Sequence, residues 1–233
     1  NKQYIIMIGL ALLFSSCSID TIRVNDTIVT KEIIAPNYSA VEIANNFNAH
    51  ITFSDNEEYI SIEANENLHK YIIAKEQDGK LIIRLKNNIN IKGQETLNVY
   101  ITTKTITNFS AAADSNIYLE NMLSTQNAKI KVTADSFFSG KVQVDKLQLI
   151  ASADARVDLY GHANYLEAKL SADAKLSDYS LAVDDLKLKM TADCKADLTV
   201  SNTINVEAIA DCRLRYKGDA IIVHKNLKAD SKI

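Results

Sequence analysis

Seven aspartates at regular intervals are the residues of this chain whose type and spacing could support chemistry. Each follows an alanine and precedes a serine, alanine or cysteine. Successive aspartates recur at intervals of about 20 residues. A column of carboxylates could bind cations. It could also form the solvated corners of a repeat, in which aspartate bonds turn amides. The seven residues are Asp114, Asp135, Asp154, Asp173, Asp193, Asp211 and Asp230.

Cations accompany five of these seven aspartates, two positions further along the chain. In a strand, residues i and i+2 share a face, so we expect the carboxylates to lie beside the cations. Like charges about 4.8 Å apart in water repel by roughly 0.9 kcal/mol per pair, and neighbouring cations would offset much of this. We therefore expect structural, charge-balanced corners, with a cation-binding stripe as the alternative and no metal site. The cations are Arg156, Lys175, Lys195, Arg213 and Lys232.

Other patterns that would support catalysis are missing from the sequence. It contains no Gly-x-Ser-x-Gly elbow and no glycine-rich phosphate loop, and its histidines are scattered. Glycoside chemistry needs one distinct pair of carboxylates, whereas the aspartates form a uniform row. We predict no catalytic residue and no cofactor. The histidines are His50, His69, His162 and His224.

The segments around the aspartates alternate between apolar and polar residues. Positions three before, five before and three after each aspartate are mostly apolar or small, and even offsets are mostly polar. This period of 2 indicates strands with one buried face, and a repeat of about 20 residues is typical of a solenoid. The sequence predicts an all-β fold, a parallel β-helix with coils of about 19 residues.

Two cysteines occupy equivalent positions in neighbouring repeats. Cys194 and Cys212 each follow an aspartate directly. Stacked coils would place their Cα atoms about 5 Å apart, which allows a disulfide. The alternative, which we favour, is a pair of stacked thiols packed as small hydrophobic residues.

The N-terminal segment, 1–17, has the features of a lipoprotein signal peptide. Lys2 precedes an apolar run from Tyr4 to Phe14, too short to span a bilayer, and Ser15 and Ser16 lead to Cys17. The segment resembles a bacterial lipobox, which implies cleavage before Cys17 and attachment of lipid to it. A plain secretory signal is the alternative.

The mature chain divides into three predicted parts. Residues 18–37 are a tether and leader strand, residues 38–109 are irregular β coils or a cap, and residues 110–233 are the regular repeats. Asp78-Gly79 predicts a hairpin turn, and residues 65–70 predict a helical turn or a loop. The net charge of −3 gives no basic field that would suggest nucleic acid.

The densest positive cluster, Arg213 to Lys217, precedes a Gly-Asp turn at Gly218. It predicts a solvated rim, with a site for an acidic sugar or lipid headgroup as the alternative. Beyond it, the open strand edge of the last coil could stack with another copy of the chain, so a homo-oligomer is a further hypothesis.

In its Ala-Asp repeats the chain resembles the head GIN domain family of auto-transporter adhesins, which is frequent among Bacteroidetes lipoproteins. Ser152-Ala153-Asp154, Ser171-Ala172-Asp173 and Thr191-Ala192-Asp193 are similar to the Ser-Gly-Asp of the family repeat. Alanine replaces glycine in all three, which argues against corners that need a positive φ. The resemblance covers about residues 38–231 and implies a β-helical domain on an exported, lipid-anchored protein.

These features favour a non-enzymatic, lipid-anchored module of the bacterial envelope, adhesin-like or structural, at the outer membrane on its periplasmic or surface face. Its expected partners are the membrane, through the lipid, and a glycan or protein ligand. Two alternatives remain at this point. One is a polysaccharide-binding or polysaccharide-degrading β-helix protein, and the other is an envelope protein that binds lipid or a small ligand.

Overall fold

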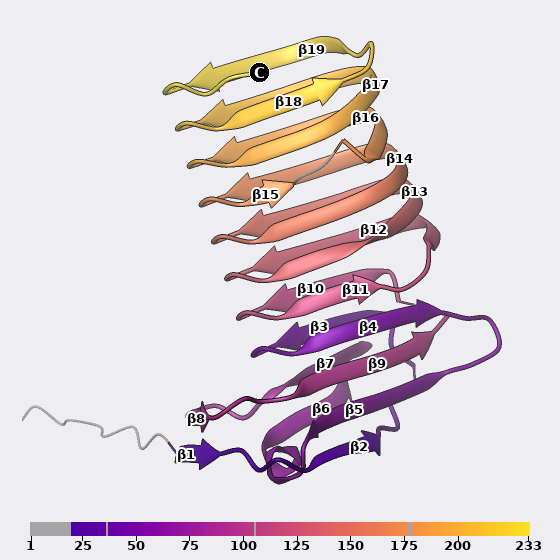
Figure 1. The fold of residues 1–233 in the computed structure, drawn as a ribbon. Helices are drawn as coiled ribbons and strands as arrows, with labels where there is room; N and C mark the ends of the chain where they lie inside the picture. The colour runs from indigo at the N-terminus through magenta and orange to yellow at the C-terminus, as the bar shows by residue number, and fades with distance from the viewer. Residues whose placement is uncertain (1–19, 36, 105, 177–178) are drawn as a thin grey trace, which may run out of the picture.

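The computed structural model describes residues 20–35, 37–104, 106–176 and 179–233. Nearly all of its regular structure is strand, wound into a column of stacked coils (Figure 1). The predicted all-β solenoid is confirmed. Cys17 and the predicted signal peptide lie outside the described residues.

The regular coils follow the predicted repeat closely. Phe138 pairs with Val157, and Leu186 pairs with Ile204, each with its equivalent in the next coil and both in parallel. The strands are β10 Asn108–Ala112, β11 Asn116–Leu119, β12 Leu123–Thr133, β13 Phe137–Ser152, β14 Arg156–Ser171, β15 Lys175–Leu176, β16 Leu181–Thr191, β17 Lys195–Ile209, β18 Arg213–Lys217 and β19 Ile221–Lys228.

Each coil has two arms that face one another. On one side the arms meet at a tight corner formed by the Ala-Asp pair, and on the other a long strand such as β13 bends smoothly from one arm into the other (Figure 1). The arms after the corners form a front sheet, and the arms before the corners form a back sheet. The coil is therefore flat and two-sided.

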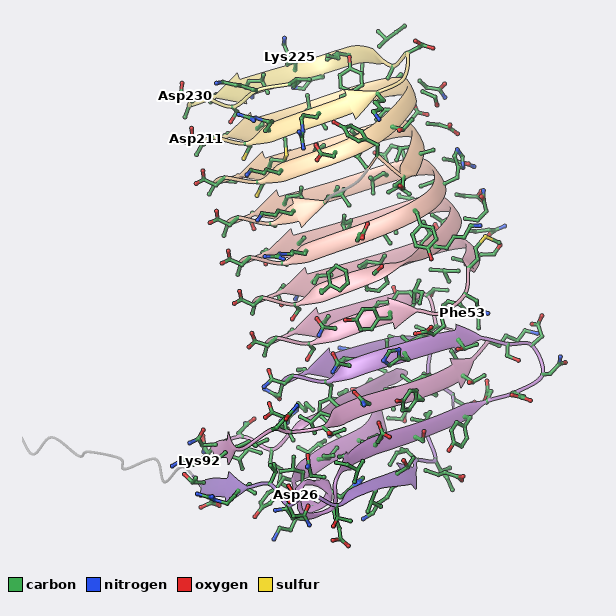
Figure 2. The ribbon with its side chains drawn as sticks, in the orientation of Figure 1. Asp26, Phe53, Lys92, Asp211, Lys225 and Asp230 are labelled. Atoms are coloured by element: carbon green, nitrogen blue, oxygen red, sulfur yellow. The ribbon has the colours of Figure 1, made fainter. Side chains whose placement is uncertain are left out.

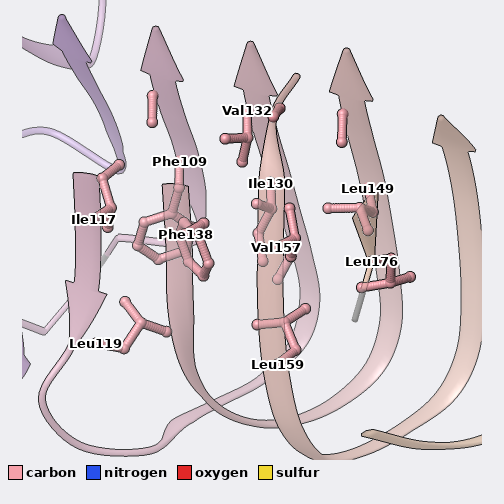
Figure 3. Close-up of a cluster of buried hydrophobic side chains, with 14 of the residues drawn as sticks. Phe109, Ile117, Leu119, Ile130, Val132, Phe138, Leu149, Val157, Leu159 and Leu176 are labelled. Carbon is pink, nitrogen blue, oxygen red and sulfur yellow. The ribbon is translucent and has the colours of Figure 1, made fainter. Parts of the chain in front are cut away.

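The core lies between the front and back sheets. Inward positions are filled by stacked apolar side chains, with Phe109 against Phe138 at 5.5 Å between ring centroids. Ile130, Leu149 and Val157 lie in the same layer and are 0–1% exposed (Figure 3). Burying such side chains contributes about 1.5–3 kcal/mol each, which is what holds successive coils together.

The N-terminal part contains one more coil of the same kind. Strand β3, Ala40–Ala44, pairs in parallel with β10, and β4, Asn48–Phe53, pairs in parallel with β11. Its corner is Asn45-Asn46, with φ of 66° and 64°. Sequence analysis missed this corner because Asn-Asn replaces Ala-Asp.

Below this coil, two strands from later in the sequence lie beneath β3 and β4. Strands β7, Lys80–Leu85, and β9, Leu97–Thr103, come later in the sequence yet pair in parallel with β3 and β4. The predicted hairpin at Asp78-Gly79 joins β6, Ile72–Gln77, to β7 in antiparallel register. The polar segment between β7 and β9 includes a short strand, β8, Ile89–Lys92.

Antiparallel strands and a short helix close the base of the column. Strand β5, Tyr59–Asn65, pairs antiparallel with β9, and β2, Ile28–Glu32, pairs antiparallel with β5. A 3₁₀ helix, η1, Glu66–Tyr71, connects β5 to β6 and buries Leu68 completely. Strand β1, Asp20–Arg23, pairs with β8 at the same end.

Candidate functional site

The seven Ala-Asp corners share one backbone conformation. The alanines have φ between 47° and 65°, and the aspartates have φ between 57° and 62°. The expectation that alanine argues against a positive φ at these corners is wrong. Each corner is instead held by its neighbours, since the amide of Asp154 donates to the carbonyl of Ala172 at 3.0 Å and that of Asp173 to Ala192 at 3.0 Å.

The residue after each aspartate lies beneath the corner, which explains why it is small. Ser136 is buried there, and its hydroxyl donates to the carbonyl of Ala134 at 3.2 Å. A left-handed alanine costs about 1–2 kcal/mol, which hydrogen bonds of about 0.5–1.5 kcal/mol each can offset in a stacked corner. The corner is therefore a structural device repeated up the column.

The corner carboxylates project outward along one edge of the column (Figure 2, Asp211 and Asp230). Among the described residues, none of the seven lies within 4.0 Å of a cationic nitrogen. The expected ion pairing with the cations two positions on is not observed. The reason is the left-handed corner, which turns the aspartate away from the face of the strand that follows. Those cations are Arg156, Lys175, Lys195, Arg213 and Lys232.

The lower front sheet carries two ladders of outward side chains. Asn116 donates through Nδ2 to Oδ1 of Asn48 at 2.8 Å, and Asn48 donates in turn to Oδ1 of Asn98 at 3.5 Å. Beside it, the ring of His50 stacks between Tyr100 and Tyr118, at 5.4 and 5.2 Å between centroids and within 21° of parallel. The ring faces cover one another, so they do not form an open platform for a sugar.

The back sheet carries a set of lysines that we call the lysine face. Parallel register places Lys131, Ile150 and Lys169 in one outward column, with Lys189 on the next rung. The six lysines on four successive rungs are Lys129, Lys131, Lys146, Lys169, Lys187 and Lys189. Sequence analysis missed this face, although the Lys-x-Lys pairs in β12 and β16 were a usable signal.

Cys194 and Cys212 lie in adjacent coils, both buried and both free thiols in this structure. Each Sγ donates to a carbonyl of its own corner, Cys194 to Thr191 at 3.3 Å and Cys212 to Ile209 at 3.3 Å. Burial, together with the neighbouring Cys212, raises the pKa of the Cys194 thiol to about 11. Such a thiol is a weak nucleophile at neutral pH.

One histidine lies beside a carboxylate and a hydroxyl on the bend between the sheets. His162 Nε2 is 3.2 Å from Oδ1 of Asp184, and Ser201 donates to the same oxygen at 2.9 Å. These hydrogen bonds lower the pKa of Asp184, the one from Ser201 most strongly. The aspartate stands between the other two groups, so the histidine is not placed to take a proton from the serine.

The positive cluster singled out near the C-terminus is largely engaged by its neighbours. Arg215 forms a bidentate pair with Asp197, at 2.7 and 2.5 Å. The ammonium of Lys217 lies 4.2 Å from the ring centroid of Tyr179. The ion pair of Arg215 offsets charge and the ring contact of Lys217 does not, and both contacts agree with a solvated rim.

A pocket of about 310 Å³ opens at the base of the column, between the end of β2 and the start of β5. Its apolar walls include Ile33, Tyr38 and Tyr59, the carboxylates Glu32 and Glu58 also line it, and Ile34 in its lining is 97% exposed. Within the described ranges, no three His, Cys, Asp or Glu side chains converge as metal ligands. No helix in that part of the chain has the length and hydropathy to span a bilayer.

Comparisons with solved structures identify proteins of the same fold. A "putative adhesin" from Bacteroides fragilis NCTC 9343 is 18% identical, with a TM-score of 0.77 over 91% of this chain and 100% of that one. A "putative adhesin" from Parabacteroides merdae ATCC 43184 is 20% identical, with a TM-score of 0.69 over 92% and 99%. A "putative lipid binding protein" from Parabacteroides distasonis ATCC 8503 is 13% identical, with a TM-score of 0.70 over 92% and 100%.

None of the curated protein sequences matches the chain. The model of one family does, over residues 37–220, and its description is "Putative auto-transporter adhesin, head GIN domain". The family and these structural relatives are named as adhesins or as a lipid-binding protein, and none is named as an enzyme. Because this match spans most of the chain, the chain belongs to the head GIN domain family.

Proposed function

We propose that this chain is a non-enzymatic, lipid-anchored, adhesin-like binding module of the bacterial outer membrane. One observation carries the proposal: the described chain enters the column at its closed base, and the regular coils extend away from that end (Figure 1). Strand β1 begins at Asp20, close behind Cys17 in the sequence. A lipid on Cys17 would therefore hold the base at the membrane and present the long faces of the coils to the surroundings.

The arrangement of polar groups supports a binding role over a catalytic one. The carboxylates at the corners form a uniform row, and Ser201 donates to Asp184 instead of to His162. Within the described part of the chain, the buried thiols donate to backbone carbonyls and not to a side-chain base that would make them nucleophilic. Rigid solenoids with long continuous faces are suited to binding extended partners.

The anchor is tested with the full-length chain in bacterial cells fed an alkyne fatty acid. We expect the wild-type chain to carry the label and to sediment with membranes, whereas Cys17→Ser loses both properties. We also expect protease added to intact cells to remove the coils, because an adhesin must face outward. An unlabelled wild-type chain, or one protected from protease until cells are lysed, would contradict the proposal.

The binding role is tested by adhesion. Cells that express the wild-type chain should bind immobilised host glycans or matrix proteins more strongly than cells lacking it, and soluble domain added in excess should compete. Neither the wild-type chain nor its Asp154→Ala and Asp173→Ala variants should cleave polysaccharide. Polysaccharide cleavage by the wild type that disappears in these variants would favour an enzyme.

A second candidate function is binding of a hydrophobic small ligand in the pocket at the base. The apolar walls of Ile33, Tyr38 and Tyr59 favour it, and the relative named a lipid-binding protein supports it. Native mass spectrometry of the purified chain should then detect a bound lipid that Tyr59→Ser releases and Tyr160→Ser, at similar exposure of 43% and 42%, retains. Ligand-free protein from several preparations would remove this candidate.

A further inference from the structure

We infer that the lysine face of the back sheet binds an anionic polysaccharide. This inference rests on the proposed binding function and adds to it the surface and the chemical class of the ligand. The face consists of outward residues from β12, β13, β14 and β16, whose parallel register stacks them rung on rung.

The charge of this face is strongly unbalanced. The outward positions of its back-sheet arms hold six lysines and two carboxylates, Glu167 and Asp185, and two further carboxylates, Asp145 and Asp184, lie next to them on the bend. Lys187 pairs with Glu167 at 3.0 Å, and Lys189 pairs with Glu207 of the next coil at 3.1 Å. The four other lysines form no ion pair within the described part of the chain, so they remain available to an anionic partner.

The lysines lower the pKa of Glu167, one of the carboxylates on this face. The pKa of Glu167 is lowered mainly by its hydrogen bond to Lys187, with further lowering by the charges of Lys169 and Lys146. Lys146 also lies 5.8 Å from the ring centroid of Tyr165. An incoming carboxylate or sulfate over this face would meet the same positive surroundings.

The spacing of the cations suits an extended polymer. Adjacent rungs are about 4.8 Å apart, so Lys169 and Lys189 lie roughly one rung apart and Lys131 and Lys169 roughly two. A uronic-acid polymer carries a carboxylate on each sugar, at intervals of the same order. A chain lying along the axis of the column would therefore place anions over Lys131, Lys169 and Lys189, with the rung of Ile150 between the first two.

Two shallow hollows give the face hydrogen-bonding groups as well as charge. A hollow of about 180 Å³ is lined by Lys129, Gln148, Ile150, Glu167 and Lys169, and a hollow of about 240 Å³ shares Lys129 and Gln148 and adds Asn108, Asn127 and Lys146. The side-chain amides can hydrogen-bond to the hydroxyls of a sugar while the lysines beside them pair with its carboxylate. A membrane surface is a poorer match, since the large apolar side chains that are most exposed, such as Ile34 and Ile221, lie elsewhere.

The cation column of the front sheet provides the matched alternative. Lys175, Lys195 and Lys232 belong to one column that also contains Arg213, and a corner aspartate stands two residues before each of the three lysines in the sequence. Removing three lysines from either sheet changes the net charge equally. The two sets of lysines differ in the sheet on which they lie and in whether hollows lined with amide side chains lie next to them.

The experiment measures binding of the chain to polygalacturonate, with neutral dextran as the control polymer. The triple variant Lys129→Gln, Lys131→Gln, Lys169→Gln should lose roughly tenfold or more in affinity, whereas Lys175→Gln, Lys195→Gln, Lys232→Gln should lose less than about threefold. Binding of the wild type should weaken with added salt, because screening reduces the attraction. Circular dichroism checks that both variants fold.

Equal losses in the two triple variants would overturn the inference, because binding would then follow net charge and not this surface. Tighter binding to phosphatidylserine vesicles than to polygalacturonate, lost in the first triple variant, would replace the glycan with a membrane. Adhesion of the wild type to a neutral glycan or a host protein, without binding to polygalacturonate, would contradict this inference but not the proposed function. Loss of all adhesion in the wild type would remove both.

Discussion

The two ends of the column are finished in different ways. At the base, η1 and the antiparallel strands β2, β5 and β6 cover the core, and Leu68 is fully buried. At the other end, β19 is an open edge whose outward and inward residues are almost all exposed. The core of a solenoid must be covered at both ends. In this chain additional strands and a helix cover the base, whereas at the other end only the side chains of β19 lie over the last coil.

The open end is protected by charge and irregular register. Lys225 occupies the inward position above Val206, where earlier coils have an apolar residue, and Figure 2 shows it on the last strand. The pairing of β17 with β19 also shifts register between Ile204 and Asn205. An inward charge and a bulge are both ways in which an edge strand resists pairing with another sheet.

The largest expected effect comes from breaking the closed end. Leu68→Ala should lower the free energy of unfolding by about 2–5 kcal/mol, because it leaves a cavity beneath η1. Leu227→Ala, the matched change at the half-buried position of β19, should cost about 1 kcal/mol or less. Urea unfolding measures both. Equal costs at the two ends would contradict the difference drawn between them.

Next in size is removal of the charge at the open end. Lys225→Leu should strengthen self-association by roughly tenfold, because it restores an apolar inward position on an unpaired edge. Lys228→Leu, an outward position on the same strand, is the control. Analytical ultracentrifugation over a range of concentrations distinguishes them. A wild type that already dimerises through β19 would show that Lys225 does not protect the edge, and would support the homo-oligomer hypothesis.

A smaller effect is expected at the corners. Ala153→Gly should stabilise the chain by about 1 kcal/mol, because glycine adopts the left-handed φ of 55° without a Cβ penalty. Ala182→Gly, within strand β16, should instead destabilise by about 0.5–1 kcal/mol. Thermal unfolding of the two variants provides the measurement. A loss of stability in both would mean that the corner conformation carries no strain.

The smallest effect concerns pH. The pKa of Asp184 is lowered by its hydrogen bonds to Ser201 and His162, so its ionised form stabilises the folded chain. That stabilisation is present above the ordinary aspartate pKa and is lost as the pH falls through the lowered value. The wild type should therefore melt slightly above Asp184→Asn at pH 7, and the difference should shrink as the pH falls below the ordinary aspartate pKa. A difference that persists in acid would assign it to packing.

The sequence predicted the repeating part of the fold well, because its information there is local. Period-2 alternation around Asp154 and its equivalents determines which side chains face inward, and the spacing determines the coil length. The crossing of β7 and β9 beneath β3 and β4 was not predictable, because it depends on contacts between distant segments. The left-handed alanines were also missed, since the hydrogen bonds that hold them come from neighbouring coils.

Of the site residues, the sequence identified the corner aspartates but not their surroundings. The i, i+2 rule placed Arg156 beside Asp154, and it failed because the chain turns between them. The lysine face depends on side chains from four rungs that only the parallel register brings together. Cys17, the predicted lipid attachment, lies in the part of the chain that the structure does not describe and stays a prediction.

The central claim, that the column is held at its base with its coils directed outward, is tested most directly by depth measurement. Fluorophores on Lys92→Cys and on Lys228→Cys mark the two ends, and the native thiols are buried and so react poorly. In the lipid-anchored protein on vesicles with quencher in the headgroups, the label at residue 92 should be quenched and that at residue 228 should not. Equal quenching at both ends, or stronger quenching at residue 228, would contradict the account.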